Sequence, residues 1–341
     1  PPPPPPPLPP HLSFFYSDYW CNSEDEQSLE FCAQQSEQQD KYFGAVRAPN
    51  GKIFFSPRDV DTIAVFDPAV DLRHVPELYT YFALTLRYTF GVTGADKYAQ
   101  PAATPGGLIV FPPAHSNSIG LIDSDSLTFS FVELSADTWG AEGCGDWTGS
   151  NCRFKYAAAV FHDGVVVFVP QNAHDVGIFD ASSHTFSRID IRTLQGGESK
   201  YSSGAVARNG LIVFAPSQAD AIGLFNASDK TFFTVPLGPL PGISTGLKWG
   251  GAALAPTGKI IFAPYQLAHV GMFDADNLSL TLIDSTMGTP ASGTPASGWY
   301  GGAVTTQNGL VVFVPSAAGN VGIFDSETAE FSSVDILQET L

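Results

Sequence analysis

The chain has 341 residues and a formal net charge of −18, because 34 acidic side chains stand against 16 basic ones. Such a charge repels nucleic acid and anionic membranes, so neither is an expected partner. No apolar stretch approaches the roughly 20 residues of a transmembrane helix, so membrane insertion is not expected either.

The chain opens with a proline run, and residues 1–10 are expected to form a polyproline II rod. One interpretation is a stiff linker, and another is a ligand for an SH3-type domain. The run also resembles the hydroxyproline-rich stretches of plant and green-algal surface glycoproteins of the pherophorin and extensin types. This resemblance implies hydroxylation and O-linked sugars at Pro1, Pro2, Pro3, Pro4, Pro5, Pro6 and Pro7.

An aromatic segment, residues 11–40, follows the rod and holds Cys21 and Cys32. The other two cysteines, Cys144 and Cys152, form a second close pair. Neither spacing matches a standard zinc pattern, although metal binding is the alternative. Two local disulfides are therefore predicted, and they imply an oxidising, extracellular compartment.

One sequence unit recurs six times in residues 41–341. In each copy a Gly opens a β-branched and aromatic run, and a Pro follows that Gly by six residues. Asn-Gly and Asp-Gly favour type I′ hairpin turns, the run reads as a buried strand, and Pro ends it. The six copies are Asn50–Pro57, Gly106–Pro113, Asp163–Pro170, Asn209–Pro216, Thr257–Pro264 and Asn308–Pro315.

The whole unit predicts four antiparallel strands. A strand rich in small residues precedes the turn, a Val-Gly-Ile-Phe-Asp strand follows the Pro, and an alternating Thr-Phe strand comes last. Successive units are 46 to 57 residues apart, close to the roughly 40–50 residues of a propeller blade. The prediction is an all-β fold, a six-bladed β-propeller. A stacked β-solenoid, the rival architecture, usually has shorter repeats.

A Lys-aromatic pair opens five of the units and is expected at one mouth of the propeller. One interpretation is an anion-binding ring. The other is one architectural Lys per blade, paired with a carboxylate of a neighbouring blade such as Asp59, Asp175 or Asp220, and repetition in each blade favours it. The lysines are Lys41, Lys97, Lys155, Lys200 and Lys248.

Two further features break the repeat or modify it. In the segment 139–152, Trp139 and Trp147 are candidates for stacking on a sugar, with Asp146 and Asn151 as hydrogen-bonding partners. The alternative is that both indoles pack down to fasten the loop. Candidate N-glycosylation sites lie in the Asn-x-Ser triplets at Asn226 and Asn277.

The Gly-x-Ile-x-Phe strand and the Gly-x-x-Asp turn resemble those of NHL and virginiamycin B lyase propellers. Such lyases use a His with acidic residues and magnesium, but that motif maps onto no position of this chain. His115, His174 and His269 follow their prolines at different distances, so they are not one repeated ligand position. No cofactor is predicted, and solvated histidines are favoured over the alternative, a divalent cation held by these histidines with Asp175 or Asp59.

The sequence favours a non-enzymatic module of a secreted or cell-surface glycoprotein that serves extracellular matrix or filament assembly. Its expected partners are other protein chains of that assembly, and glycans. Alternatives are a polysaccharide-active or lyase-type enzyme, or a carbohydrate-binding lectin, using one face of the propeller. Residues 1–10, 11–40 and 41–341 are the expected rod, aromatic segment and propeller.

Overall fold

The structure is a computed structural model that describes residues 41–60, 62–69, 81–85, 96–134, 154–241, 246–285 and 298–336. Residues 1–41 and residues 42–341 form two separate compact units. All described residues except Lys41 belong to the second unit. The proline rod and the aromatic segment 11–40 lie outside the described residues. In the described part, no helix is long and apolar enough to cross a membrane.

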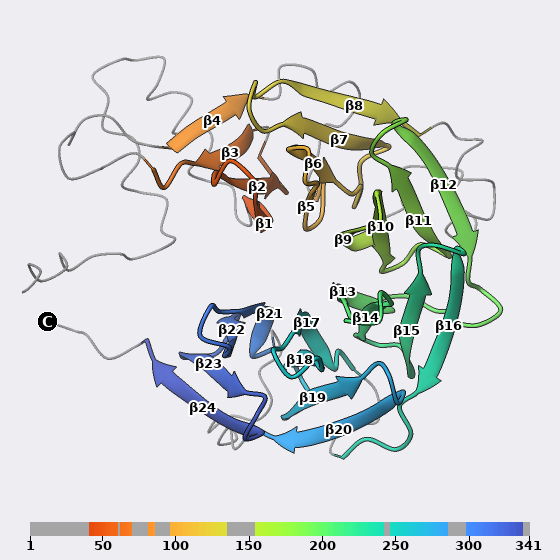
Figure 1. Cartoon of the computed structure of the whole chain (residues 1–341), viewed down its shortest axis with the longest axis vertical. Helices are drawn as coiled ribbons and strands as arrows, with labels where there is room; N and C mark the ends of the chain where they lie inside the picture. Colours follow the sequence, from red (N-terminus) through yellow and green to blue (C-terminus); the bar gives the residue numbers. More distant parts are fainter. Residues whose placement is uncertain are drawn as a thin grey trace, which may run out of the picture. The chain divides into compact units, whose positions relative to one another are not determined.

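The second unit contains six four-stranded antiparallel sheets, each formed by consecutive strands (Figure 1). The first three are defined as blade 1, β1 (Tyr42–Arg47), β2 (Ile53–Pro57), β3 (Thr62–Phe66) and β4 (Tyr81–Thr85); blade 2, β5 (Ala102–Ala103), β6 (Leu108–Phe111), β7 (Ser118–Asp123) and β8 (Phe129–Glu133); and blade 3, β9 (Tyr156–His162), β10 (Val165–Pro170), β11 (Asp175–Asp180) and β12 (Thr185–Asp190).

The remaining sheets are blade 4, β13 (Tyr201–Val206), β14 (Ile212–Pro216), β15 (Ala221–Asn226) and β16 (Thr231–Pro236); blade 5, β17 (Trp249–Leu254), β18 (Ile260–Pro264), β19 (His269–Asp274) and β20 (Ser279–Asp284); and blade 6, β21 (Tyr300–Thr305), β22 (Val311–Pro315), β23 (Asn320–Asp325) and β24 (Glu330–Asp335). The first strand of each blade is innermost (Figure 1). The prediction of a six-bladed β-propeller with four antiparallel strands per blade is confirmed.

The predicted turns also form. The turn glycine of each copy has a φ between 82° and 90°, a region that favours glycine over other residues. In blade 3 the preceding Asp163 has a φ of 48°, so both central residues are left-handed, as a type I′ turn requires. These turns set the register, which pairs Val165 with His162 on the adjacent strand.

The core lies between blades, because the second strand of each inner blade is buried on both faces. Val167 and Val169 of blade 3 pack against Ile212 and Phe214 of blade 4, and all four have 0% exposure. The outermost strand alternates instead, as β12 does, because its outer face meets solvent. Each blade thus has one face for the preceding blade and one for the following blade.

Small residues on the innermost strands allow close approach. A Cβ added at Gly250 would lie 2.2 Å from the carbonyl oxygen of Tyr300 on the next blade. Blade 2 is an exception, because its innermost strand has only two residues. Pro101 lacks an amide hydrogen there, and Gln100 instead pairs with blade 3, donating to the Ala157 oxygen at 3.3 Å.

Asparagine side chains of the hairpin turns join successive blades. Asn50 Nδ2 of blade 1 donates to the Ser124 oxygen of blade 2 at 2.8 Å. Asn209 Nδ2 of blade 4 donates to the Ala275 oxygen of blade 5 at 3.0 Å. In both cases the acceptor directly follows the Asp that ends the third strand. We call this bond the turn latch.

Candidate functional site

The aromatic residue that opens each blade reaches the first residue of the third strand in the same blade. Tyr98 and Ser118 hydroxyls lie 3.1 Å apart, and Tyr300 Oη donates to Asn320 Oδ1 at 2.5 Å. In blade 4 this position is Ala221, and the buried Tyr201 hydroxyl has no hydrogen-bond partner among the described residues. The aromatic position is therefore architectural, and its partner varies from blade to blade.

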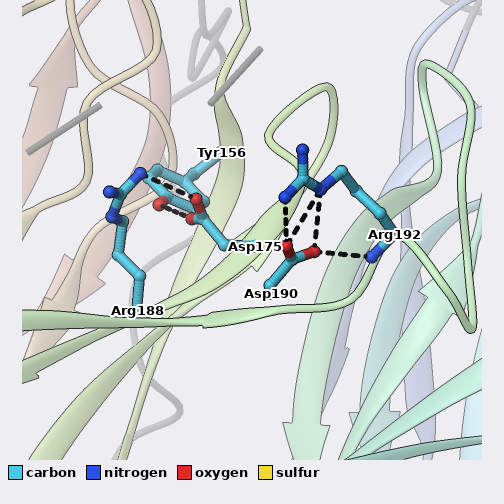
Figure 2. Close-up of polar contacts among 5 residues, drawn as sticks. All are labelled: Tyr156, Asp175, Arg188, Asp190 and Arg192. Carbon is cyan, nitrogen blue, oxygen red and sulfur yellow. Dashed lines mark hydrogen bonds and ion pairs between the residues drawn. The ribbon is translucent and has the colours of Figure 1, made fainter. Parts of the chain in front are cut away.

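Blade 3 places a charge at this position, which breaks the symmetry of the repeat. Tyr156 Oη donates to Asp175 Oδ1 at 2.5 Å, and Arg188 Nη1 donates to Asp175 Oδ2 at 3.1 Å (Figure 2). Asp175 is 5% exposed and Tyr156 is fully buried. Both carboxylate oxygens have a donor, as a buried charge requires.

Electrostatics in this group follow from its burial. Desolvation raises the pKa of Asp175, while the Tyr156 hydrogen bond and the Arg188 charge oppose that rise. Desolvation and the neighbouring Asp175 charge raise the pKa of Tyr156 well above its usual value. The tyrosine therefore keeps its proton and acts as a donor. A carboxylate so enclosed has both oxygens bonded within blade 3 and presents no open acid or base to a ligand.

A second, exposed pair lies at the end of β12. Asp190 is the cross-strand partner of Asp175, and Arg192 Nε and Nη2 reach Asp190 Oδ2 at 2.9 and 2.5 Å (Figure 2). The Arg192 hydrogen bonds are the main cause of the lowered pKa of Asp190. Acidic and basic side chains thus lie next to one another in this part of blade 3. Exposed pairs of this kind contribute little to stability.

Three polar side chains from two blades meet on the face where the post-proline segments lie. Arg58 Nε pairs with Asp96 Oδ1, and His115 Nε2 lies 3.8 Å from Asp96 Oδ2. Their side chains are 16% to 25% exposed. The Asp96 amide donates to Asp59 Oδ1 at 2.9 Å, which fixes the segment that carries Asp96. We call Arg58, Asp96 and His115 the Arg58 cluster.

Two aromatic rings flank the Arg58 cluster. The Arg58 guanidinium lies 5.5 Å from the centre of the Phe43 ring and 6.0 Å from that of Phe154, within cation–π range. His115 meets Phe154 edge-on, with ring centres 4.8 Å apart. Phe43 is 43% exposed. A cation, an imidazole and an exposed aromatic ring therefore come together where blades 1, 2 and 3 meet.

The repeated lysines are turned into the protein. Lys155 Nζ donates to the His115 and Ser116 oxygens, both at 3.1 Å, and Lys248 Nζ donates to the Gln218 oxygen at 3.1 Å. Lys97 Nζ makes longer bonds of this kind, and Lys200 Nζ donates to the Gly197 oxygen. All four lysines are buried, with exposures of 0% to 6%.

Most acceptors of these lysines are backbone oxygens just past the proline of the preceding blade. The side chains of Lys97, Lys155 and Lys248 therefore bind successive blades together, and we call this bond the lysine clamp. Carboxylates also act on two of these lysines, since Lys248 Nζ lies 4.0 Å from Asp220 Oδ1 and the charges of Asp175 and Glu198 oppose the lowering of the Lys200 pKa. Burial lowers the pKa of Lys155 and of Lys200 to about 8. Anion binding by the five lysines stays a prediction.

Most other predicted site residues lie outside the described residues: Trp139, Asp146, Trp147, Asn151, Cys21, Cys32, Cys144 and Cys152. Both sequons are described. Asn277 is exposed in the turn after β19, whereas Asn226, the last residue of β15, is only partly exposed. The side-chain amide of Asn277 donates to Asp274 Oδ2 at 2.7 Å. Glycosylation at both positions stays a prediction.

Within the described ranges, no three His, Cys, Asp or Glu side chains come close enough to hold a metal ion. His174 lies near Asp190, whose pKa its charge lowers, and His269 begins β19. The three loop histidines therefore take separate roles in separate blades.

Comparisons with known proteins agree with this architecture. No family model matches the chain, and no curated protein matches it. Among solved structures, virginiamycin B lyase from Staphylococcus aureus superposes with a TM-score of 0.64 at 13% identity, covering 89% of this chain and 87% of that chain. A streptogramin B lyase gives a TM-score of 0.63 at 14% identity, covering 88% and 84%.

A chain of the mitotic checkpoint complex also matches, with a TM-score of 0.55 at 10% identity over 89% of this chain and 79% of that chain. The shared feature is the propeller fold. Proteins so different in identity and name show that the likeness concerns the scaffold and not an activity.

The Arg58 cluster was not predicted from the sequence. Arg58 and Asp96 are 38 residues apart, and the sequence marks His115 only as one of three histidines that follow a repeat proline. Asp175 could have been found from the sequence, because a carboxylate replaces the residue that other copies have as the first residue of the third strand. Arg188 lies on the adjacent strand, two residues out of register with Asp175, so the strand pairing is needed to find it.

Proposed function

We propose that this chain is a non-enzymatic structural and interaction module of a secreted or cell-surface glycoprotein, serving matrix or filament assembly. The observation that carries the proposal is that the repeated polar groups form their bonds within the protein. Four repeated lysines are buried, and their ammonium groups bind backbone oxygens. The charged group that breaks the repeat in blade 3 is enclosed and has both oxygens bonded.

Surface chemistry supports the same role. The net charge of −18 keeps separate modules soluble, and a calcium-rich or polycationic matrix would balance it. The proline run and the two sequons would carry the glycans of such a matrix. Two disulfides in the non-repeated segments would suit the same compartment.

The test is to express the full chain with a secretion signal in a eukaryotic host and to measure its intact mass, glycopeptides and sedimentation. We expect N-glycans that disappear in the N226Q and N277Q variants, disulfide-linked peptides, and particles larger than one chain. A secreted chain that is monomeric, carries no glycan and cleaves a panel of polysaccharides would contradict the proposal.

Carbohydrate binding is a second candidate function, and the Arg58 cluster favours it. An exposed Phe43 ring beside a guanidinium and an imidazole offers a stacking surface together with polar groups. The test is glycan-array binding by the full chain and by Phe43→Ala, with Leu194→Ala as a control at another exposed apolar residue outside this face, 53% exposed against 43% for Phe43. Binding unchanged in Phe43→Ala would exclude this surface.

A further inference from the structure

A β-bulge lies at the start of the innermost strand, and the residue in it is large in blade 1. In blades 1, 3, 4, 5 and 6 the pairing of this strand shifts register next to the opening aromatic residue. Bulges of this kind re-aim side chains and are common beside functional sites. The bulge residue of blade 1 is Phe43, whereas the other blades have a small residue at the same place in the repeat: Ala99, Ala157, Ser202, Gly250 and Gly301.

A second departure from the repeat lies directly after the proline that ends β2. Arg58 stands there, and its equivalents in the other blades are uncharged: Ala114, Gln171, Ser217, Tyr265 and Ser316. The Arg58 guanidinium lies 5.5 Å from the centre of the Phe43 ring. The two side chains that depart from the repeat in blade 1 therefore lie against each other. An architectural role would recur in each blade, so this pair is a candidate for a role in binding.

The exposure of Phe43 does not come from its place in the first blade. The bulge residue of a blade faces the following blade, since Ser202 Oγ donates to the Trp249 oxygen at 2.7 Å. A Cβ added at Gly250 would lie 2.2 Å from the Tyr300 oxygen of the following blade. Phe43 thus belongs to the contact between blades 1 and 2. A large side chain does not fit into so close a contact, and the Phe43 ring is 43% exposed.

Polar groups beside the Phe43 ring are held in place by other bonds. Arg58 Nε donates to Asp96 Oδ1, and the Arg58 guanidinium lies 6.0 Å from the centre of the Phe154 ring. The Asp96 amide donates to Asp59 Oδ1 at 2.9 Å. The ring, the guanidinium and the Asp96 carboxylate are therefore ordered before a ligand arrives, which lowers the entropic cost of binding.

An exposed aromatic ring with ordered polar groups beside it fits a sugar ring. One face of a pyranose consists of C–H groups, which pack on an aromatic ring. Its hydroxyl groups lie at the edge, where they donate to carboxylates and accept from a guanidinium. The cluster offers one ring for the apolar face and charged partners for the hydroxyl groups.

The charges at the surface of the cluster favour an uncharged sugar. Asp96 and Asp59 are both partly exposed, and Arg58 is already paired with Asp96. Lys97 and Lys155 lie beside the cluster, but both are buried and their ammonium groups donate to backbone oxygens. A ligand carboxylate or sulfate would therefore meet two carboxylates, and the net charge of −18 adds to the repulsion.

We propose that Phe43 and the Arg58 cluster bind an uncharged sugar ring and discriminate against uronate-bearing and sulfated sugars. The ring stacks on Phe43, its hydroxyl groups donate to Asp96, and Arg58 positions both side chains. The inference rests on the carbohydrate-binding candidate above and specifies the class of ligand.

The test uses full-length variants that change one role at a time. Phe43→Ala introduces the residue that blades 2 and 3 have at this place, so the fold should tolerate it. Asp96→Asn keeps a side-chain oxygen for Arg58 and removes the negative charge. Leu194→Ala is the control at an exposed apolar residue of another blade. Circular dichroism checks that each variant is folded.

The probe is an array of uncharged, uronate-bearing and sulfated oligosaccharides, followed by calorimetric titration of the members that bind. The unaltered chain and Leu194→Ala should bind uncharged members. Phe43→Ala should weaken that binding about ten-fold or more, because the ligand no longer buries an aromatic ring. Asp96→Asn should raise the affinity for uronate-bearing members relative to uncharged ones several-fold. A loss of stability alone does not change selectivity in this way.

Three results would overturn the inference, and they differ in what they leave standing. Strongest binding to uronate-bearing or sulfated members, lost in Phe43→Ala, would leave carbohydrate binding at this surface in place with the opposite selectivity. Unchanged selectivity in Asp96→Asn would show that Asp96 does not contact the ligand. Binding to no member of the array would also exclude the carbohydrate-binding candidate, while leaving the proposed structural role in place.

Discussion

The lysine clamp gives the sharpest energetic prediction, because Lys155 is buried and its bonds are short. Lys155→Met keeps the apolar stem and removes only the ammonium group. Two backbone oxygens at 3.1 Å then lose a charged donor, and each such bond contributes about 1.5–3 kcal/mol. The Ala114 oxygen keeps a donor, since it also accepts from the Lys155 amide at 3.0 Å.

The cost of burying the charge opposes these bonds. Desolvation lowers the pKa of Lys155 from 10.5 to about 8. At about 1.4 kcal/mol per pKa unit, that shift corresponds to about 3 kcal/mol against the charged form in the folded chain. The difference between the two effects is a loss of up to about 3 kcal/mol in the free energy of unfolding for Lys155→Met at pH 7.

The pH dependence has a definite sign. Between pH 8 and pH 10.5 the unfolded chain holds a proton on Lys155 that the folded chain has released, so the free energy of unfolding rises with pH. Lys155→Met lacks this rise. Its deficit relative to the unaltered chain should therefore grow over that range, by at most about 3 kcal/mol.

The assay is urea unfolding followed by circular dichroism at several pH values, with Lys230→Met as a control at an exposed lysine. The control should match the unaltered chain at each pH. A Lys155→Met deficit that shrinks as the pH rises would refute the reasoning, because it would mean that the fold favours the charged form of Lys155.

Two further predictions use matched pairs within the repeat. Tyr156→Phe removes the donor to Asp175 and should lower the free energy of unfolding by about 1.5–3 kcal/mol. Tyr201→Phe removes a buried hydroxyl without a partner among the described residues and should cause no loss. Equal effects of the two changes in urea unfolding would contradict this. Asn209→Ala breaks a turn latch and should cost about 1 kcal/mol. Asn308→Ala, whose side chain bonds only within its own turn among the described residues, should cost less, and equal losses in the two variants would contradict this.

The fold was predictable because its determinants are local and repeated. The turn glycine, the β-branched run and the proline specify one hairpin, and six copies of it specify six blades. Two details were not predictable in this way. Blade 2 has a short innermost strand because Pro101 interrupts the pairing, and the lysines bind backbone oxygens, which carry no sequence signal.

The site was less predictable, because its groups come together only in the folded chain. Arg58 and Asp96 belong to segments of different blades, so their pairing depends on how blades pack. The exposure of Val314 cannot be inferred from the sequence either. The repeat assigns it to a buried position, yet Val314 is 50% exposed whereas its equivalent Val169 is fully buried.

The most direct test of the central claim is an electron cryo-microscopy reconstruction of the assembled, secreted full-length chain. The account predicts particles that contain more than one copy of the chain, with six four-stranded blades in each copy and glycan density at Asn226 and Asn277. Single unassembled chains without glycan density would contradict it.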